Sequence, residues 1–160
     1  MARARPVVAH EESAAEDGTP TLLYLIGRAD RVVRRAIGEV LQAHGLSVNE
    51  YTTLSVLHRR GGLSNAQLAR RALVSPQSMH GVLLCLEERR LVRRSAHPNH
   101  GRIRRTQLTP KGIRLLAACD EHVRDVEARM VDGLSPAERA TLREGLIRGV
   151  RALHGGLGLD

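Results

Sequence analysis

The chain has 160 residues, a length that suits one domain with a buried core. It contains no Phe or Trp and only two Tyr, so the core must come from aliphatic side chains, and their helical spacing predicts a mainly α-helical fold. The formal net charge is +8, and the basic residues are 24 arginines and one lysine.

The two cysteines and the hydropathy exclude two broad classes of protein. Cys85 and Cys119 cannot form the disulfide framework of a small secreted domain, although two thiols leave room for one bond. No apolar stretch approaches the roughly 20 residues of a membrane span, and the first residues lack the apolar core of a signal peptide. We therefore expect a cytoplasmic protein.

The first 45 residues predict a tail followed by a long helix. Residues 1–18 mix acidic and basic side chains without an apolar period, so we expect a flexible tail. Thr19-Pro20 is typical of a helix start, and His44-Gly45 is typical of a helix end. The helix between them, about 20–43, carries a broad apolar stripe.

Five further helix starts share one pattern of capping residues. Ser47 and Ser64 are each followed three residues later by Glu or Gln and flanked by apolar residues, which predicts a capping box with a hydrophobic staple. Ser75-Pro76 and Thr109-Pro110 combine a cap with proline at the first helical position, and Ser135-Pro136 adds Glu138 to that combination.

Residues 64–108 predict a helix-turn-helix followed by a β-hairpin. The hairpin lies between Leu91 and Leu108, where turn-forming residues occupy 96–101, and we expect short strands and a mobile tip. Between Arg59 and Arg105 the chain has eleven arginines against two glutamates, a net charge of about +9. A solvated surface mixes charges, whereas a face that follows phosphates keeps one sign, so this segment predicts contact with duplex DNA.

The second helix of this motif should present one face to DNA. At about 100° per residue, Met79, Val82, Leu83 and Leu86 share a narrow arc that must face the core. The opposite arc and its flanks should contact DNA by hydrogen bonding, by apolar contact or by close backbone approach, and comprise Gln77, Ser78, His80, Gly81 and Leu84, with Cys85 beside them. Ser75 is better explained as a helix cap.

The arginines of the hairpin should contact the DNA backbone or a narrow minor groove. Strand alternation places Arg102 and Arg104 on one face and Arg105 on the other. Six further arginines are either backbone contacts or partners in ordinary ion pairs: Arg70, Arg71, Arg89, Arg90, Arg93 and Arg94.

The C-terminal helices, about 110–131 and 136–154, carry apolar stripes but have no sheet or second core to bury them. We expect a second copy of the chain to bury them, and bundling within one chain is the alternative. The predicted fold is thus mainly α with a small β-hairpin wing. Its parts are a dimerisation helix (19–45), a winged helix-turn-helix lobe (46–108), C-terminal dimerisation helices (109–155) and a short tail (156–160).

The order of these motifs resembles the MarR family of bacterial winged-helix repressors. The resemblance rests on LSVNEYTTLSVL, NAQLARRALVSPQSMHGVLLCLEERRLVRR, the basic wing and LTPKG, and spans about residues 20–155. It implies a homodimer on pseudo-palindromic DNA, often released by a small aromatic compound, a metal or an oxidant. One position departs from the family: His100 stands where an Asp commonly precedes the wing arginine, here Arg102. Insertion of Arg102 into the minor groove is therefore either less favoured or sensitive to pH.

The same resemblance places an effector between the dimer helices and the DNA-binding lobe. The matching positions are Tyr24, Arg28, Tyr51 and His58. A guanidinium beside a phenol suits an aromatic acid, although each residue also has a structural explanation.

We therefore expect a homodimeric, ligand-responsive repressor that needs no cofactor. Alternatives are a metal- or redox-sensing regulator of the same fold, or a winged helix that binds protein or single-stranded nucleic acid. Cys119 and His122 with His44 lack a recognised metal-ligand spacing, so no metal site is assigned, and Cys85 is better explained as an inert thiol. An enzyme is not expected, because the chain lacks GxSxG, a phosphate-binding loop and a dinucleotide fingerprint.

Overall fold

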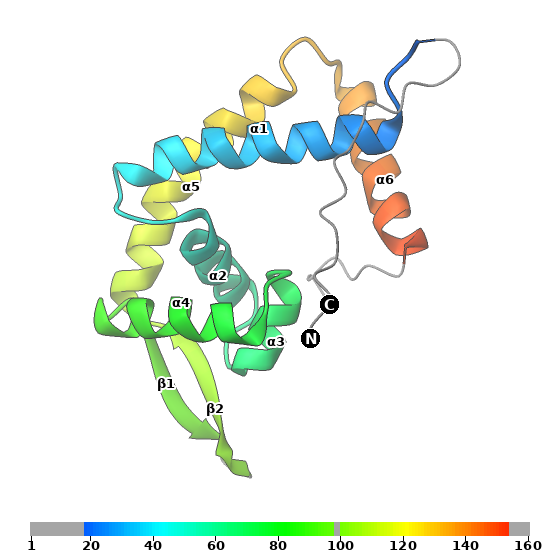
Figure 1. The fold of residues 1–160 in the computed structure, drawn as a ribbon. Coiled ribbons are helices and arrows are strands. Elements are labelled where there is room, and N and C mark those ends of the chain that lie inside the picture. Colours follow the sequence, from blue (N-terminus) through cyan, green and yellow to red (C-terminus); the bar gives the residue numbers. More distant parts are fainter. Residues whose placement is uncertain (1–17, 98–99, 154–160) are drawn as a thin grey trace, which may run out of the picture. The chain divides into compact units, whose positions relative to one another are not determined.

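The computed structural model describes residues 18–97 and 100–153, with the backbone alone at 97 and 100–103. Six helices and a two-stranded hairpin follow one another in that part of the chain (Figure 1). They are α1 (Leu22–Gln42), α2 (Val48–Arg59), α3 (Asn65–Arg71), α4 (Pro76–Glu88), β1 (Val92–His97), β2 (His100–Leu108), α5 (Pro110–Met130) and α6 (Pro136–Ala152). The predicted fold class, mainly α with a hairpin wing, is confirmed.

The chain divides into two units, residues 1–36 and 37–160, and α1 crosses the boundary between them. In the first unit α1 begins later than the sequence predicted. The Thr21 hydroxyl accepts a hydrogen bond from the Tyr24 N–H at 3.2 Å, and the Thr21 carbonyl accepts from the Leu25 N–H at 3.0 Å. Thr21 therefore caps the helix, and the prediction of a start at Thr19-Pro20 was wrong.

The helix ends in the second unit follow the predicted local pattern. Ser47, Ser64 and Ser135 form complete capping boxes, and Ser75 and Thr109 cap helices that begin with proline. At the end of α1, Gly45 adopts a φ of +63°, and the Leu46 N–H donates to the Leu41 carbonyl. Glycine is favoured in this left-handed conformation because it has no Cβ.

The core of the second unit is built mainly from leucine. It gathers side chains from the end of α1, from α2, α3 and α4, and from the start of β1, including Leu41, Leu54, Leu68, Met79, Leu83, Leu86 and Leu91. Leu116 and Cys119 of α5 belong to the same core. Part of the α5 stripe that the sequence assigned to a partner chain is therefore buried within its own chain.

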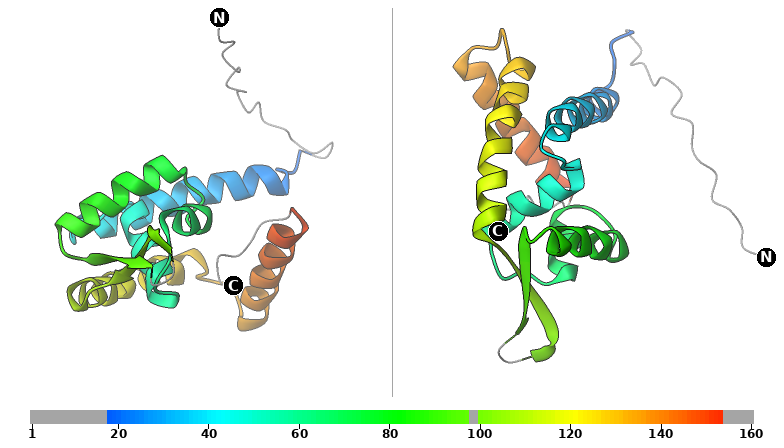
Figure 2. Two further views of the ribbon diagram at one scale, coloured as in Figure 1. Left: turned by 90° about the horizontal axis from the view of Figure 1, so that it is seen from below. Right: turned by 90° about the vertical axis from the view of Figure 1, so that its left-hand side faces the viewer.

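The hairpin is antiparallel, with Val92 opposite Leu108 and a shift of register after Ala96. Leu63 forms an isolated β-bridge with Thr106, which links the segment before α3 to the hairpin. The right-hand view of Figure 2 shows the strands projecting beyond α2, α3 and α4. The expectation of short strands was wrong for β2, which has nine residues, whereas β1 has six. The tip, residues 98–99, lies outside the described residues, as do the tails 1–17 and 154–160.

Within the ranges described, no helix combines the length and the apolar character that crossing a membrane requires.

Candidate DNA interface

Helix α4 buries one face and leaves the other open. Met79, Leu83 and Leu86 are fully buried and Val82 is half-buried, as the periodicity predicted. Ser75 caps the helix by accepting a hydrogen bond from the Ser78 N–H at 3.0 Å. The helix is thus anchored by three apolar side chains and a capped N-terminus.

The outward face of α4 carries the residues that the sequence proposed for base contact. Gln77 and His80 are exposed, and in the described part of the chain neither side chain has a hydrogen-bond partner. Leu84 is 50% exposed although it is apolar. A Cβ added at Gly81 would meet nothing within 4 Å, so packing within this chain does not require glycine there. Both features are explained if another molecule approaches this face closely.

Ser78 differs from its neighbours on the same face. It is exposed, but its hydroxyl lies 2.8 Å from the Ser75 hydroxyl in a hydrogen bond. A contact between Ser78 and DNA would therefore share or replace an interaction that already closes the start of α4.

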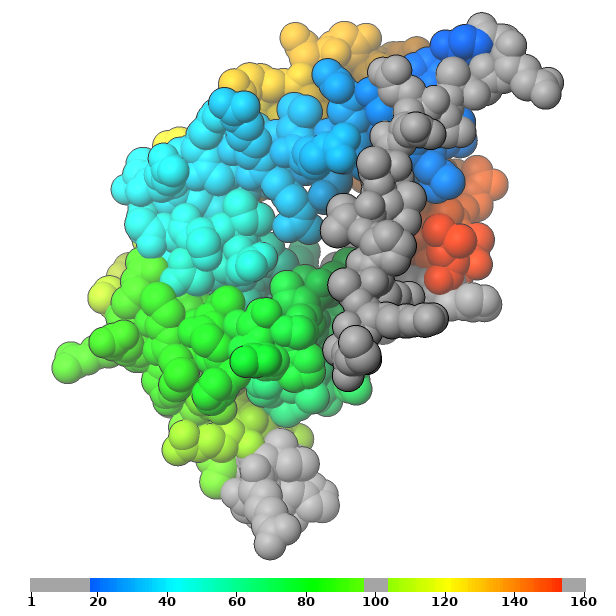
Figure 3. Space-filling model, viewed as in Figure 1, coloured from blue at the N-terminus to red at the C-terminus, as the bar shows by residue number. Residues whose placement is uncertain are grey.

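The wing lies next to the green surface of α3 and α4 (Figure 3), and it carries exposed arginines. Arg104 pairs with Ala96 across the hairpin and is exposed, and Arg105, opposite Ser95, is exposed too. Arg102 lies in β2, but its side chain is outside the described residues. The irregular register beyond Ala96 also means that simple alternation does not place Arg102 with Arg104.

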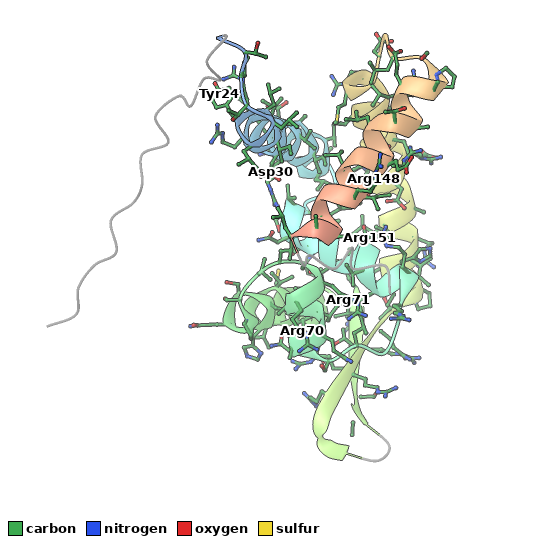
Figure 4. All side chains as sticks on the ribbon, turned by 90° about the vertical axis from the view of Figure 1, so that its right-hand side faces the viewer. Tyr24, Asp30, Arg70, Arg71, Arg148 and Arg151 are labelled. Carbon is green, nitrogen blue, oxygen red and sulfur yellow. The ribbon has the colours of Figure 1, made fainter. Side chains whose placement is uncertain are left out.

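The structure shows which of the six remaining arginines already have a partner within the chain. Arg89 pairs with Glu50 at 3.1 Å and Arg94 with Glu87 at 3.7 Å. Arg93 donates to the Gln107 side chain across the hairpin. Arg70 and Arg71 lie on α3 (Figure 4), and Arg70 is exposed with no partner among the described residues. Arg90 is also exposed, and its side chain has no partner in the described ranges, so Arg70 and Arg90 are the better candidates of the six for a phosphate contact.

A carboxylate of α2 joins the network around Arg89. Glu50 is only 8% exposed, and its Oε1 accepts hydrogen bonds from Arg89 Nη1 at 3.1 Å and from Cys85 Sγ at 3.2 Å. Burial raises the pKa of Glu50, but hydrogen bonds from Ser47 and Cys85 and the charge of Arg89 outweigh it and leave the pKa below its ordinary value. The pKa of Cys85 is raised, chiefly by its hydrogen bond to Glu50, which makes this exposed thiol less reactive.

A hollow lies between α2 and α5. Its volume is about 230 Å³, and it is lined by Tyr51, Thr52, Ser55, His58, Arg59, Leu116 and Asp120. Two predicted effector residues, Tyr51 and His58, thus line the same cavity. Tyr24 and Arg28 belong to the other unit of the chain. Sequence reasoning missed Arg59 and Asp120, although Arg59 adjoins His58 in the last turn of α2.

Tyr51 and Asp120 are joined across this hollow. The Tyr51 hydroxyl donates to Asp120 Oδ1 at 2.8 Å. Burial and this hydrogen bond raise the pKa of Tyr51 to about 12. The Tyr51 hydroxyl proton is therefore already engaged in a hydrogen bond to Asp120.

His44, which lies just after α1, approaches His122 in the middle of α5, with His44 Nε2 3.4 Å from His122 Nδ1. Cys119 is buried in the core, and the pKa of its thiol is raised by burial. Over the described ranges, no three His, Cys, Asp or Glu side chains gather as a metal site would need.

A helix-turn-helix followed by a strand hairpin, with an open polar helix face and basic strands, defines a winged helix-turn-helix protein. The profile described as MarR family matches residues 44–103. HTH-type transcriptional repressor Rv2887 of Mycobacterium tuberculosis is 35% identical over 116 residues, which cover 72% of this chain and 84% of that protein. The chain belongs to the MarR family.

Two solved structures of Mycobacterium tuberculosis Rv2887 share this fold. The complex with DNA has a TM-score of 0.67 at 32% identity and covers 80% of this chain and 96% of its own. The complex with salicylic acid has a TM-score of 0.68 at 32% identity and covers 82% and 98%. The relatives are regulators of transcription.

Proposed function

We propose that the protein is a homodimeric repressor of transcription that binds duplex DNA sequence-specifically and is released by a small aromatic acid. The observation that carries the proposal is the open face of α4, with its unpartnered Gln77 and His80, beside a wing that carries exposed arginines. The complex of the relative Rv2887 with DNA supports it. The activity is binding rather than catalysis, and the site of action is the cytoplasm.

Selection from a random pool of duplexes, followed by footprinting, tests DNA recognition. We expect a pseudo-palindrome whose half-sites lie about one helical turn, roughly 10 bp, apart. Recovery of no consensus, or binding to single strands in preference to duplex, would refute the proposal.

Dimerisation is supported by apolar side chains that the chain leaves exposed. Leu22, Ile26 and Val32 of α1 are at least half exposed, and α6 has no buried residue in the described part of the chain. A second copy that covers these helices would remove apolar area from water at about 25 cal/mol per Å².

Sedimentation at micromolar concentration should therefore show a dimer. The double substitution Leu22→Glu and Ile26→Glu should dissociate it, because a buried charge without a partner is costly. Leu84→Glu, at a leucine of α4 that is as exposed as Ile26, is the control and should remain dimeric. A wild-type monomer would overturn this part of the proposal.

The effector is assigned to the hollow between α2 and α5. Because the Tyr51 phenol already donates to Asp120, the carboxylate of an aromatic acid must be met by His58 and Arg59. A cavity of about 230 Å³ is smaller than the roughly 300–1,000 Å³ of drug-sized sites, so a single-ring acid fits best. The relative's complex with salicylic acid supports this class.

Calorimetric titration with salicylate tests the assignment. We expect binding that weakens at least about tenfold in Arg59→Gln, since a hydrogen bond to a charged group contributes about 1.5–3 kcal/mol. Arg60→Gln is the matched control, because Arg60 does not line the hollow. Equal affinity in both variants, or no binding at millimolar salicylate, would show that the effector site is elsewhere.

A further inference from the structure

Among the helices that the structure describes, three begin with the same capping box, and in each the side chain of the third residue after the cap accepts the hydrogen bond. Glu50 Oε2 accepts from the Ser47 N–H at 2.7 Å, Gln67 Oε1 from the Ser64 N–H at 2.9 Å, and Glu138 Oε2 from the Ser135 N–H at 2.8 Å. Gln67 shows that a single amide oxygen is sufficient for this cap.

Only one of the three boxes, among the described residues, reaches another helix. Glu138 is exposed and bonds to Ser135 alone, and the bonds of Gln67 stay within its own box. Glu50 is nearly buried, and its second oxygen, Oε1, accepts from Arg89 and Cys85 of α4. The carboxylate at this position thus does something that the cap does not require.

The two donors stand at the C-terminal end of α4. Arg89 is the residue that ends the helix, and Cys85 lies one turn earlier. Gln77 is eight residues before Cys85, about 12 Å along the helix axis at 1.5 Å per residue. A tilt of about 5° at the anchored end would therefore move Gln77 by roughly 1 Å, which is larger than the spread of good hydrogen-bond distances.

We propose that Glu50 is a positioning residue for DNA recognition: one carboxylate oxygen caps α2, and the other sets the orientation of α4 through Arg89 and Cys85. This inference rests on the proposed role of α4 in reading DNA. It predicts that loss of the second acceptor damages sequence discrimination more than binding in general, because phosphate contacts tolerate a tilted helix better than base contacts do.

Cys85 supplies a readout that needs no DNA. Its thiol is exposed, and its raised pKa comes first from the hydrogen bond to Glu50, with Arg89 acting in the opposite direction. These are the two charged groups that bear on the thiol. When the Glu50 charge is removed, the pKa of Cys85 should fall, and the thiol should react faster with a disulfide reagent such as 5,5′-dithiobis(2-nitrobenzoate).

The experiment is Glu50→Gln in the full-length chain. Gln has one acceptor oxygen, so it must give up either the cap or the link to α4. We expect operator affinity to fall about tenfold or more and affinity for a scrambled duplex to change less than about threefold. The pH midpoint of Cys85 labelling, assigned by peptide mass analysis, should shift to lower pH. Glu138→Gln, the same substitution in the exposed box, should change none of these.

A second variant separates positioning from simple loss of stability. Ser47→Ala removes the hydroxyl that accepts from the Glu50 N–H and leaves Oε1 with its partners. It should lower stability by about the value of a cap, yet keep the operator-to-scrambled ratio and the labelling midpoint of Cys85.

Three outcomes would overturn the proposal. They are normal discrimination in Glu50→Gln, an unshifted Cys85 midpoint, and a loss of discrimination in Ser47→Ala as large as that in Glu50→Gln. A wild-type chain with no preferred duplex would instead refute the proposed function, and the positioning role with it.

Discussion

Substitution of Gly112 by alanine should destabilise the protein strongly, because the start of α5 lies directly against the hairpin. A Cβ built at Gly112 would overlap the Leu91 carbonyl oxygen and would lie 3.1 Å from the Leu91 carbonyl carbon and 3.4 Å from Leu108 Cδ2. Leu91 O is backbone, so it cannot swing aside as a side chain would. The same oxygen accepts hydrogen bonds from the Thr109 N–H at 3.0 Å and the Thr109 hydroxyl at 3.1 Å.

The size of the effect follows from these contacts. Relieving the overlap requires α5 and the hairpin to separate by roughly 1 Å, and such overpacking costs about 1–3 kcal/mol. The separation also weakens the two Thr109 hydrogen bonds, each of which contributes about 0.5–1.5 kcal/mol. Alanine recovers about 1 kcal/mol of helix propensity over glycine. We expect a net loss of about 3 kcal/mol in the free energy of unfolding.

Urea denaturation followed by circular dichroism measures this loss, at one fixed protein concentration because the protein is expected to dimerise. Gly81→Ala is the matched control, since its added Cβ meets nothing within 4 Å in the interior of α4. It should gain up to about 1 kcal/mol. Equal midpoints for the two variants would refute the argument that the Leu91 carbonyl requires glycine at 112.

Three further predictions concern the turn, the DNA contacts and the phenol. Leu73 adopts a φ of +53° and is 85% exposed. Leu73→Gly should therefore relieve the strain of the left-handed backbone without loss of buried apolar area. The free energy of unfolding should rise by about 0.5–1 kcal/mol, which thermal melting can check. Gln77→Ala should cost about 1–3 kcal/mol on the operator and little on a scrambled duplex, whereas Arg102→Ala should weaken binding to both. If Arg102 neutralises one phosphate, the magnitude of the slope of log K against log salt should fall by about 0.9 in Arg102→Ala. Binding titrations at several salt concentrations would contradict us if the two patterns were exchanged. Folding raises the pKa of Tyr51 from 10.0 to about 12, so the stability that this phenol contributes is complete below pH 10 and disappears as pH rises through 12. Denaturation at pH 9 to 12 should therefore show a loss of unfolding free energy in wild type that is smaller in Tyr51→Phe. Identical curves for the two proteins would count against the Tyr51–Asp120 bond.

Much of the fold could be predicted from the sequence because the signals that start and end its helices are local. The caps at Ser47, Ser64, Ser75, Thr109 and Ser135 each depend on residues within four positions, and all five helix starts were correct. The buried face of α4 followed from the helical period alone. The one wrong start, at Thr19-Pro20, arose where Thr21 offered a competing cap two residues later.

The resemblance to the family likewise depended on the order of short motifs, which a sequence displays directly. Chain order and local chemistry therefore determined the fold class, the helix that faces outward and the basic hairpin. The same information identified Gln77, His80, Gly81 and Leu84 as the exposed face of α4, and the structure places all four at exposed positions.

Only the tertiary structure decided which polar groups are already engaged. Glu50 and Arg89 are 39 residues apart in the chain, and Tyr51 and Asp120 are 69 apart, so no local pattern relates them. These pairs decide that Arg89 holds α4 rather than a phosphate and that the Tyr51 phenol is not available as a donor to a ligand. The tertiary structure also places Arg59 with His58 in the hollow. Side chains meet in this way because packing brings distant segments of the chain together. The energy of a buried charge or hydroxyl depends on its hydrogen-bond partners, and these partners can be far away in the sequence.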